Sequence, residues 1–232
     1  MKPYYQDDFV TLFHGDCLEI ADWWANADVL VTDPPYGIAY ESNVNRDRRN
    51  VKKGTPIKND SSLDARDKAL ALWGTRPAVV FGRWDAPRPE GTRARLIWDK
   101  GNSVGMGDLT LPWGRSEEEI YILGTGFAGK RTGNVIRQQM LMSADRERPD
   151  HPTPKPVPLM ETLIEKCPPG TVADPFAGSG STLVAAKRLG RRAIGVELEE
   201  KYCEIAAQRL SQDVLDFGAL TNTPDPTTTL IV

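Results

Sequence analysis

The segment Asp33-Pro34-Pro35-Tyr36 combines residue types that can hold an amino group at the end of a predicted strand. It directly follows the apolar run Val29–Thr32, and ligands of open α/β sheets bind beyond the carboxyl ends of the strands. Because prolines lack an N–H donor, the Asp33 carboxylate and the Pro34 carbonyl form a rigid pair of acceptors. Such a pair suits a nitrogen with two N–H groups, and Tyr36 adds a flat face for a planar ring. The structural alternative is a turn that leaves a buried strand, with Tyr36 as packing.

A second motif is a glycine-rich loop that joins a predicted strand to a predicted helix. Gly178 and Gly180 allow a sharp turn and a close approach of the backbone to a ligand. Ser181 and Thr182 begin the helix, where free N–H groups attract an anion. Glu197 ends the next strand, about 20 residues on, where nucleotide-binding α/β units place the acid that binds ribose hydroxyls. The motif predicts a ligand with a ribose and an anionic end, and the alternative is a purely structural turn.

Two better-known phosphate motifs do not fit this loop. A P-loop requires Gly-Lys-Ser/Thr after the glycines, and here the nearest lysine, Lys187, lies on the predicted helix. The dinucleotide pattern requires a third glycine, and Leu183 occupies that position.

Strands that alternate with helices must position both motifs. Seven apolar or β-branched runs predict strands at residues 10–14, 29–32, 78–82, 96–98, 120–123, 171–173 and 192–196. Helical spacing predicts helices at residues 17–25, 62–73, 157–167, 181–189 and 199–210. The alternation predicts an α/β fold with a mainly parallel sheet.

Composition excludes several classes of protein. The chain has 232 residues, 40% hydrophobic and 26% charged, which are values of an ordinary globular protein. Three cysteines without a C-x-x-C pair and two distant histidines argue against a disulfide framework and against a metal site. No apolar run approaches the ~20 residues of a membrane span, and no secretory signal is evident. We expect a cytoplasmic protein, in a bacterial cell or in the host of a phage that encodes it, with no membrane and no metal.

Two polar stretches predict functional loops. Residues 41–60 and 125–156 are long for loops of a compact domain. Their basic residues predict phosphate contacts, and those assigned to nucleic acid are Arg46, Arg48, Arg49, Lys52, Lys53, Lys130 and Arg131. A solvated loop is the alternative for each. Residues 220–232 predict a flexible tail.

Together the two motifs resemble those of the S-adenosylmethionine-dependent DNA amino-methyltransferases, which modify N6 of adenine or N4 of cytosine. The resemblance rests on Asp33–Tyr36 and on the run from Asp174 to Thr182. The catalytic motif precedes the cofactor motif, an order similar to the β group of that family. It implies a Rossmann-like methyltransferase fold with motifs in permuted order. The sheet would have seven mostly parallel strands, helices on both faces and one antiparallel strand near an edge.

The same resemblance implies roles for individual residues. Asp33, Pro34, Pro35 and Tyr36 would be catalytic. Asp16 and Cys17 would lie at the adenine end of the cofactor, and the segment from His151 to Pro156 would bring Thr153 and Lys155 near its methionine carboxylate. The whole implied S-adenosylmethionine site is Asp16, Cys17, Asp33, Thr153, Lys155, Asp174, Phe176, Gly178, Gly180, Ser181, Thr182 and Glu197.

The implied activity is methyl transfer to N6 of adenine in double-stranded DNA, as in restriction-modification systems, with the base flipped out of the duplex. N4-cytosine transfer is the close alternative, because the same acceptors serve any exocyclic amine. A non-catalytic, cofactor-binding DNA regulator is the alternative from another class. One methyltransferase domain would span residues 1–232. Its target-recognition segment, about residues 125–150, is short, so selectivity would shift to the loop after Tyr36 or to a second subunit, as in a homodimer.

Net charge at first argues against a DNA-binding protein. The chain carries 29 basic and 32 acidic residues, whereas nucleic-acid-binding domains are usually basic. The 77 residues after Lys155 carry 7 basic and 10 acidic groups, and the first 155 balance at 22 each. The acidic excess therefore lies in the part assigned to the cofactor. We expect a modest, strongly salt-sensitive affinity for DNA.

Overall fold

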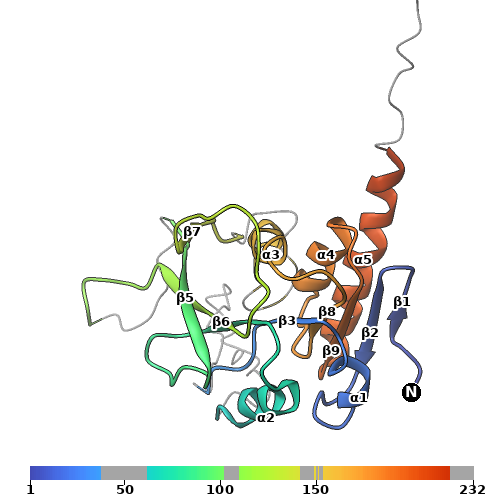
Figure 1. The fold of residues 1–232 in the computed structure, drawn as a ribbon. Helices are drawn as coiled ribbons and strands as arrows, with labels where there is room; N and C mark the ends of the chain where they lie inside the picture. Colours follow the sequence, from blue (N-terminus) through green and yellow to red (C-terminus); the bar gives the residue numbers. More distant parts are fainter. Residues whose placement is uncertain (38–61, 102–109, 142–148, 150, 152–153, 220–232) are drawn as a thin grey trace, which may run out of the picture.

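The computed structural model describes residues 1–37, 62–101, 110–141, 149, 151 and 154–219 (Figure 1). The predicted basic loop at 41–60, Thr153 and the tail at 220–232 lie outside the described residues. Arg46, Arg48, Arg49, Lys52 and Lys53 belong to that loop, so their predicted contacts with DNA stay predictions.

Within the described residues, nine strands form a single sheet in the order β1-β2-β9-β8-β3-β4-β6-β5-β7. Their bounds are β1 Tyr5–Gln6, β2 Val10–His14, β3 Val29–Thr32, β4 Ala78–Gly82, β5 Thr92–Asp99, β6 Glu117–Leu123, β7 Val135–Arg137, β8 Val172–Asp174 and β9 Ala193–Glu197. The five neighbouring strands β2, β9, β8, β3 and β4 pair in parallel, with Val10 opposite Ala193 and Leu30 opposite Ala78. β6 runs antiparallel to both of its neighbours, and β1 runs antiparallel to β2.

All seven predicted strands are present, and the α/β class is confirmed. The predicted total of seven strands is wrong, since the described residues add β1 and β7 at the two edges. β1 has two residues and β7 has three, too short for a period-2 pattern to be visible. β7 lies within the stretch predicted as a loop at 125–156, where pairing with β5 holds a largely exposed segment in the sheet.

Helices pack on both faces of the sheet, as expected. Their bounds are α1 Ala21–Trp24, α2 Asp64–Trp73, α3 Val157–Ile164, α4 Ser181–Arg188 and α5 Glu200–Ala219. In Figure 1, α3, α4 and α5 lie above the sheet, and α1 and α2 lie below it. None of the helices in the described ranges is long and apolar enough to span a bilayer.

The helix predicted at residues 17–25 is shorter than expected, because only Ala21–Trp24 is helical. The Asp16 side chain accepts a hydrogen bond from Leu18 N, and the Asp16 carbonyl accepts one from Glu19 N. These local bonds give the backbone an alternative to a helix.

Alternate residues of β3 fill an apolar cluster on each face. Val29 and Val31 belong to the cluster under α3, α4 and α5, whereas Leu30 belongs to the one over α1 and α2. All three side chains are fully buried. Because a strand covered on both faces has no polar side, its sequence is a continuous apolar run rather than an alternating one.

Gly195 allows α4 to lie close to β9. A Cβ atom built on Gly195 would lie 2.6 Å from Leu183 Cδ1 and 3.2 Å from Ala177 Cβ. We expect Gly195→Ala to lower the free energy of unfolding by roughly 1–3 kcal/mol, because the added methyl overpacks this interface. Urea denaturation measures the change. Gly133→Ala is the matched control, since a Cβ there would meet nothing within 4 Å; equal effects of both substitutions would contradict the assignment.

Candidate active site

The carboxyl ends of neighbouring parallel strands bring the predicted motifs to one edge of the sheet. Asp33 directly follows β3, and Asp174 ends β8 beside it. Glu197 ends β9, the next strand, and Asp16 lies two residues after β2. These four strands are consecutive in the sheet. The structure therefore brings together side chains that are up to 181 residues apart in the sequence.

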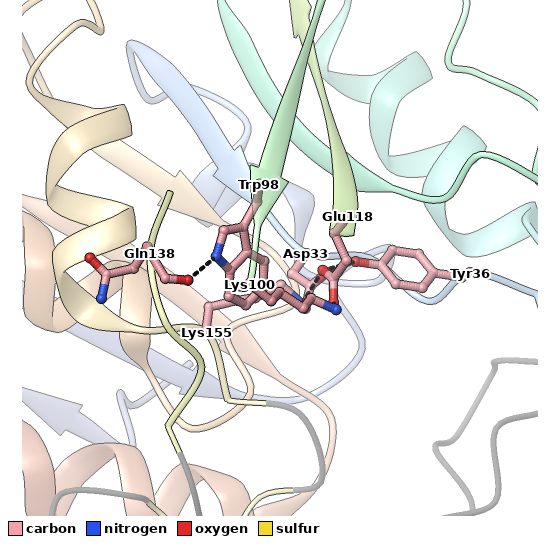
Figure 2. Close-up of polar contacts among 7 residues, drawn as sticks. All are labelled: Asp33, Tyr36, Trp98, Lys100, Glu118, Gln138 and Lys155. Atoms are coloured by element: carbon pink, nitrogen blue, oxygen red, sulfur yellow. Dashed lines mark hydrogen bonds and ion pairs between the residues drawn. The ribbon is translucent and has the colours of Figure 1, made fainter. Parts of the chain in front are cut away.

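Asp33 is held by two hydrogen-bond donors, one on each carboxylate oxygen (Figure 2). The Tyr36 hydroxyl donates to Oδ1. The Lys155 ammonium donates to Oδ2 at 2.5 Å. The Lys155 side chain is 6% exposed and that of Asp33 is 23% exposed. The sequence predicted Asp33 and Tyr36 at one site, and the structure adds Lys155 as a direct partner of the carboxylate.

Glu118 is a residue of this site that the sequence analysis missed. Its Oε2 lies 3.2 Å from Lys155 Nζ, and its Oε1 lies 2.6 Å from Lys100 Nζ. Because β6 is antiparallel, its first residues lie at the edge where the parallel strands end. The visible signal is three consecutive glutamates, residues 117–119, at the start of an apolar strand. Lys100 was also missed; it follows the last residue of β5, which lies opposite the first residue of β6 and therefore at the same edge.

Aromatic rings surround the Lys155 ammonium. Its Nζ lies 5.0 Å from the ring centre of Phe81, 5.8 Å from that of Tyr36 and 6.0 Å from that of Trp98. The Trp98 indole N–H donates to the Gln138 carbonyl at 2.7 Å (Figure 2), which fixes the ring. The rings exclude water and favour a cation at this position.

Burial and neighbouring charges shift the ionisation of the cluster. Burial raises the pKa of Asp33, and repulsion by Glu118 adds to this, while Lys155 opposes it. Burial also disfavours ionised Glu118, yet Lys155 and Lys100 outweigh burial and hold its pKa below the ordinary value. Burial would lower the pKa of Lys155, but Asp33 and Glu118 raise it. Burial and the carboxylate of Asp33 keep Tyr36 protonated by raising its pKa.

Asp174 organises the start of the glycine-rich loop. Its Oδ1 accepts hydrogen bonds from Thr32 Oγ1 at 2.7 Å and from Phe176 N at 3.1 Å. Thr182, at the start of α4, also donates to its carboxyl group. Burial raises the pKa of Asp174 to about 6, although these hydrogen bonds oppose the shift. Asp174 therefore ties the loop to β3 and to α4, which is a structural role in addition to the predicted one.

Glu197 reaches back to the glycine-rich loop. Its Oε2 accepts a hydrogen bond from Gly178 N at 2.8 Å, and its Oε1 accepts one from Glu199 N at 2.8 Å. Burial raises the pKa of Glu197 above its ordinary value. Gly178 and Gly180 have φ angles of 52° and 81°, in the left-handed region that favours glycine. The glycine-rich loop therefore lies against Glu197 at the end of the neighbouring strand, where the sequence predicted an acid for ribose; its contact with a ribose stays a prediction.

Asp16 and Cys17 lie next to this acid. Gly15 N donates to the Glu197 carbonyl at 2.9 Å, so the chain after β2 follows the end of β9. Asp16 is half-buried, while Cys17 is buried. Burial raises the pKa of the Cys17 thiol to about 12, which makes it an unreactive packing residue. The predicted contacts of both residues with a cofactor stay predictions.

The structure does not bring Lys130 to the Asp33 edge. The Lys130 carbonyl accepts a hydrogen bond from Lys166 Nζ, beyond the C-terminal end of α3. The preceding β6 ends at Leu123 opposite Ala78, the first residue of β4, so this turn lies at the amino ends of the strands. Lys130 and Arg131 are exposed. Among the residues that the structure describes, no group of three His, Cys, Asp or Glu could hold a metal ion.

Comparisons with known proteins agree with this arrangement. The profile of a family described as DNA methylase matches residues 126–208. The type II methyltransferase M2.DpnII of Streptococcus pneumoniae is 40% identical in an alignment that covers 91% of this chain and 93% of that protein. The type II methyltransferase M.HinfI of Haemophilus influenzae is 44% identical in an alignment that covers 91% of this chain and 71% of that protein.

Solved structures share the fold at lower identity. The crystal structure of the complex of M1.HpyAVI with SAM has a TM-score of 0.61 at 24% identity and covers 87% of this chain and 98% of that one. The PvuII DNA methyltransferase, described as cytosine-N4-specific, has a TM-score of 0.63 at 16% identity and covers 93% of each chain.

The raised pKa of Asp174 predicts a pH dependence of stability. A folded-state pKa of about 6, above the ordinary 3.8, means that native Asp174 binds its proton more tightly than the unfolded chain does. Its stabilising contribution is complete below pH 4 and is lost as pH rises to about 6. Asparagine does not titrate, so the free energy of unfolding of the wild type should fall by about 2 kcal/mol relative to Asp174→Asn between pH 4 and pH 7. Urea denaturation across this range measures it, and parallel pH curves would contradict the shift.

Proposed function

Because the chain belongs to the family of N6-adenine and N4-cytosine DNA methyltransferases, we propose that it transfers a methyl group from S-adenosylmethionine to N6 of an adenine flipped out of double-stranded DNA. The observation that carries this proposal is the position of Asp33. Its half-buried carboxylate lies at the carboxyl edge of the sheet, next to β8, which leads into the glycine-rich loop, and two strands from β9, which ends at Glu197. An amine acceptor and a nucleoside-binding loop on adjacent strands are what methyl transfer between two bound molecules requires.

In this proposal the cofactor would bind at the part of the edge formed by β2, β9 and β8. Glu197 accepts the ribose hydroxyls, because each of its oxygens keeps a lone pair beyond the bond from Gly178 or Glu199. Ser181 and Thr182 are buried at the N-terminus of α4, where free N–H groups favour the cofactor's carboxylate. Asp16 lies at the adenine end. The remaining contacts in this proposal come from Phe176, Gly178 and Gly180, with Thr153 and Lys155 near the carboxylate.

The chemistry requires a better nucleophile than a free base amine, whose lone pair is delocalised into the ring. Hydrogen bonds from the amine to the Asp33 carboxylate and the Pro34 carbonyl favour a pyramidal nitrogen with a localised lone pair. The cofactor supplies an electrophilic methyl group on sulfur. The new N–C bond would form as the bond between this methyl group and sulfur breaks, and the electron pair of the broken bond would leave with the sulfur. The amine then loses one proton, to Asp33 or to water.

Tyr36 changes partner when the base enters. Its hydroxyl occupies Asp33 Oδ1, one of the oxygens that the amine needs. Its ring stacks on the flipped base, so the hydroxyl must leave that oxygen. The Pro34 and Pro35 rings fix the backbone between these two residues, so that the acceptors keep their positions.

The choice of adenine rests on the resemblance of Asp33–Tyr36 to the motif of adenine enzymes. N4-cytosine transfer is the second candidate, since the acceptor pair serves either amine and a neighbour in fold is described as cytosine-N4-specific. Nucleoside mass spectrometry of DNA from cells that express the protein separates N6-methyladenine from N4-methylcytosine. In this proposal residues 1–232 form one methyltransferase domain, and a homodimer adds DNA-contacting surface to a short recognition segment at 125–150.

We expect Asp33→Ala to lower the methyl-transfer rate by at least about 10²-fold, because the amine loses its charged acceptor. The affinity for S-adenosylmethionine should change little, since the proposed ribose and carboxylate contacts come from Glu197, Ser181 and Thr182 rather than from Asp33. Transfer of labelled methyl groups to unmethylated DNA and calorimetric titration of the cofactor measure the two quantities. Asp8→Ala, at an exposed position, is the control. A near wild-type rate for Asp33→Ala would overturn the mechanism.

We expect Glu197→Ala to weaken S-adenosylmethionine binding by about ten-fold or more, because a hydrogen bond to a charged group contributes roughly 1.5–3 kcal/mol. Glu200→Ala, at an exposed position on α5, should leave the affinity unchanged. Calorimetric titration measures both, and thermal unfolding confirms that both variants are folded. An unchanged isotherm for Glu197→Ala would contradict the ribose assignment.

A further inference from the structure

Charges of alternating sign form a row that ends at Asp33. Lys100 Nζ lies 2.6 Å from Glu118 Oε1, Glu118 Oε2 lies 3.2 Å from Lys155 Nζ, and Lys155 Nζ lies 2.5 Å from Asp33 Oδ2 (Figure 2). The side chains of Lys100 and Glu118 are 13% and 15% exposed. Buried charges are tolerated only when they are paired, so each member of the row depends on its neighbours.

Glu118 divides the charge of Lys155 between two carboxylates. Without Glu118, the buried ammonium would have Asp33 as its single anionic partner in the row. A carboxylate fully neutralised by a lysine is a weaker hydrogen-bond acceptor and a weaker base towards a substrate amine. Lys100 in turn holds the other oxygen of Glu118, which keeps that side chain ionised and fixed.

Glu118 is also a second acceptor for Tyr36. The Tyr36 hydroxyl, which donates to Asp33 Oδ1, lies 3.4 Å from Glu118 Oε2. A small displacement transfers the hydroxyl from Asp33 to Glu118. A buried hydroxyl without an acceptor is costly, and this transfer avoids that cost when the amine takes Oδ1.

We propose that Glu118 is a positioning residue for methyl transfer. It shares the charge of Lys155, so that Lys155 does not fully neutralise Asp33, and it accepts the Tyr36 hydroxyl when the substrate amine binds Asp33. This inference rests on the proposed function, because it requires Asp33 to receive the amine. Glu118 itself touches neither reacting atom.

The titratable groups that face Asp33 fix the direction of the expected pH effects. They are Tyr36 on its own loop, Lys155 before α3, Glu118 on β6 with Lys100 behind it, and Asp174 at the end of β8. Repulsion by Glu118 raises the pKa of Asp33, and Lys155 lowers it. In a plot of kcat against pH, Glu118→Gln should therefore move the acid limb to lower pH, and Lys155→Met should move it to higher pH.

The test compares Glu118→Gln with the wild type in transfer of labelled methyl groups to DNA from a strain without DNA methylation. We expect kcat to fall about ten-fold, the S-adenosylmethionine Kd to stay unchanged and the acid limb to shift to lower pH. Glu118→Asp, which keeps the charge, should restore the position of the limb. Glu117→Gln is the matched control, since alternation along β6 directs its side chain to the other face. An unchanged kcat, or a lower kcat with an unshifted limb, overturns the proposal.

A second measurement separates this inference from the proposed function. Carboxyl ¹³C NMR follows the ionisation of Asp33 without any substrate, and the resonance is assigned by its loss in Asp33→Asn. A lower pKa of Asp33 in Glu118→Gln supports the coupling, and an unchanged pKa overturns it. Absence of methyl transfer to DNA by the wild type overturns the proposed function instead.

Discussion

The backbone hydrogen bonds that pair β2, β9, β8, β3 and β4 in parallel determine where each functional side chain lies. Parallel strands end at the same edge, so their common direction is enough to bring together four motifs that follow four different strands. Helices on both faces bury these strands and prevent the sheet from slipping in register, because a slip by one residue would expose the apolar side chains of one face. The glycine-rich loop depends on the same packing, since Gly195 lets Leu183 of α4 lie close to β9, while Gly178 of the loop donates to Glu197 at the end of that strand.

Antiparallel β6 contributes its first residues to this edge of the sheet. A strand that runs the other way brings its first residues, rather than its last, to the place where the parallel strands end. Glu118 reaches Lys155 for that reason, and Lys155 reaches Asp33. The edge therefore has two parts with different physical character. Backbone N–H groups and acids on β8 and β9 lie in the half proposed for the cofactor, whereas buried side-chain ion pairs walled by aromatic rings form the half proposed for catalysis.

The ion pairs of the catalytic half are poor contributors to stability, since the desolvation of two buried charges offsets much of their attraction. Their effect is to fix which groups are ionised and where the oxygens of Asp33 lie. In the proposed reaction Asp33 binds a neutral amine that later loses a proton, and this role favours a carboxylate whose charge is shared rather than neutralised. The same constraint explains why Tyr36, whose hydroxyl blocks that carboxylate, lies within reach of a second acceptor.

The amino-acid sequence by itself determined the fold class, the seven main strands and the two motifs, because each depends on local patterns: apolar runs, glycines that permit left-handed φ, and prolines that remove donors. It also placed Asp33, Asp174 and Glu197 at strand ends. It did not reveal β1 and β7, which are too short for a periodic signal, or the short extent of α1, which local bonds of Asp16 limit. Only the tertiary structure decided the partners of Asp33. Glu118 and Lys155 are 85 and 122 residues away along the chain, and the direction of β6, which brings Glu118 to the site, follows from long-range strand pairing that no local pattern encodes. The position of Lys130 at the opposite edge follows from the same pairing.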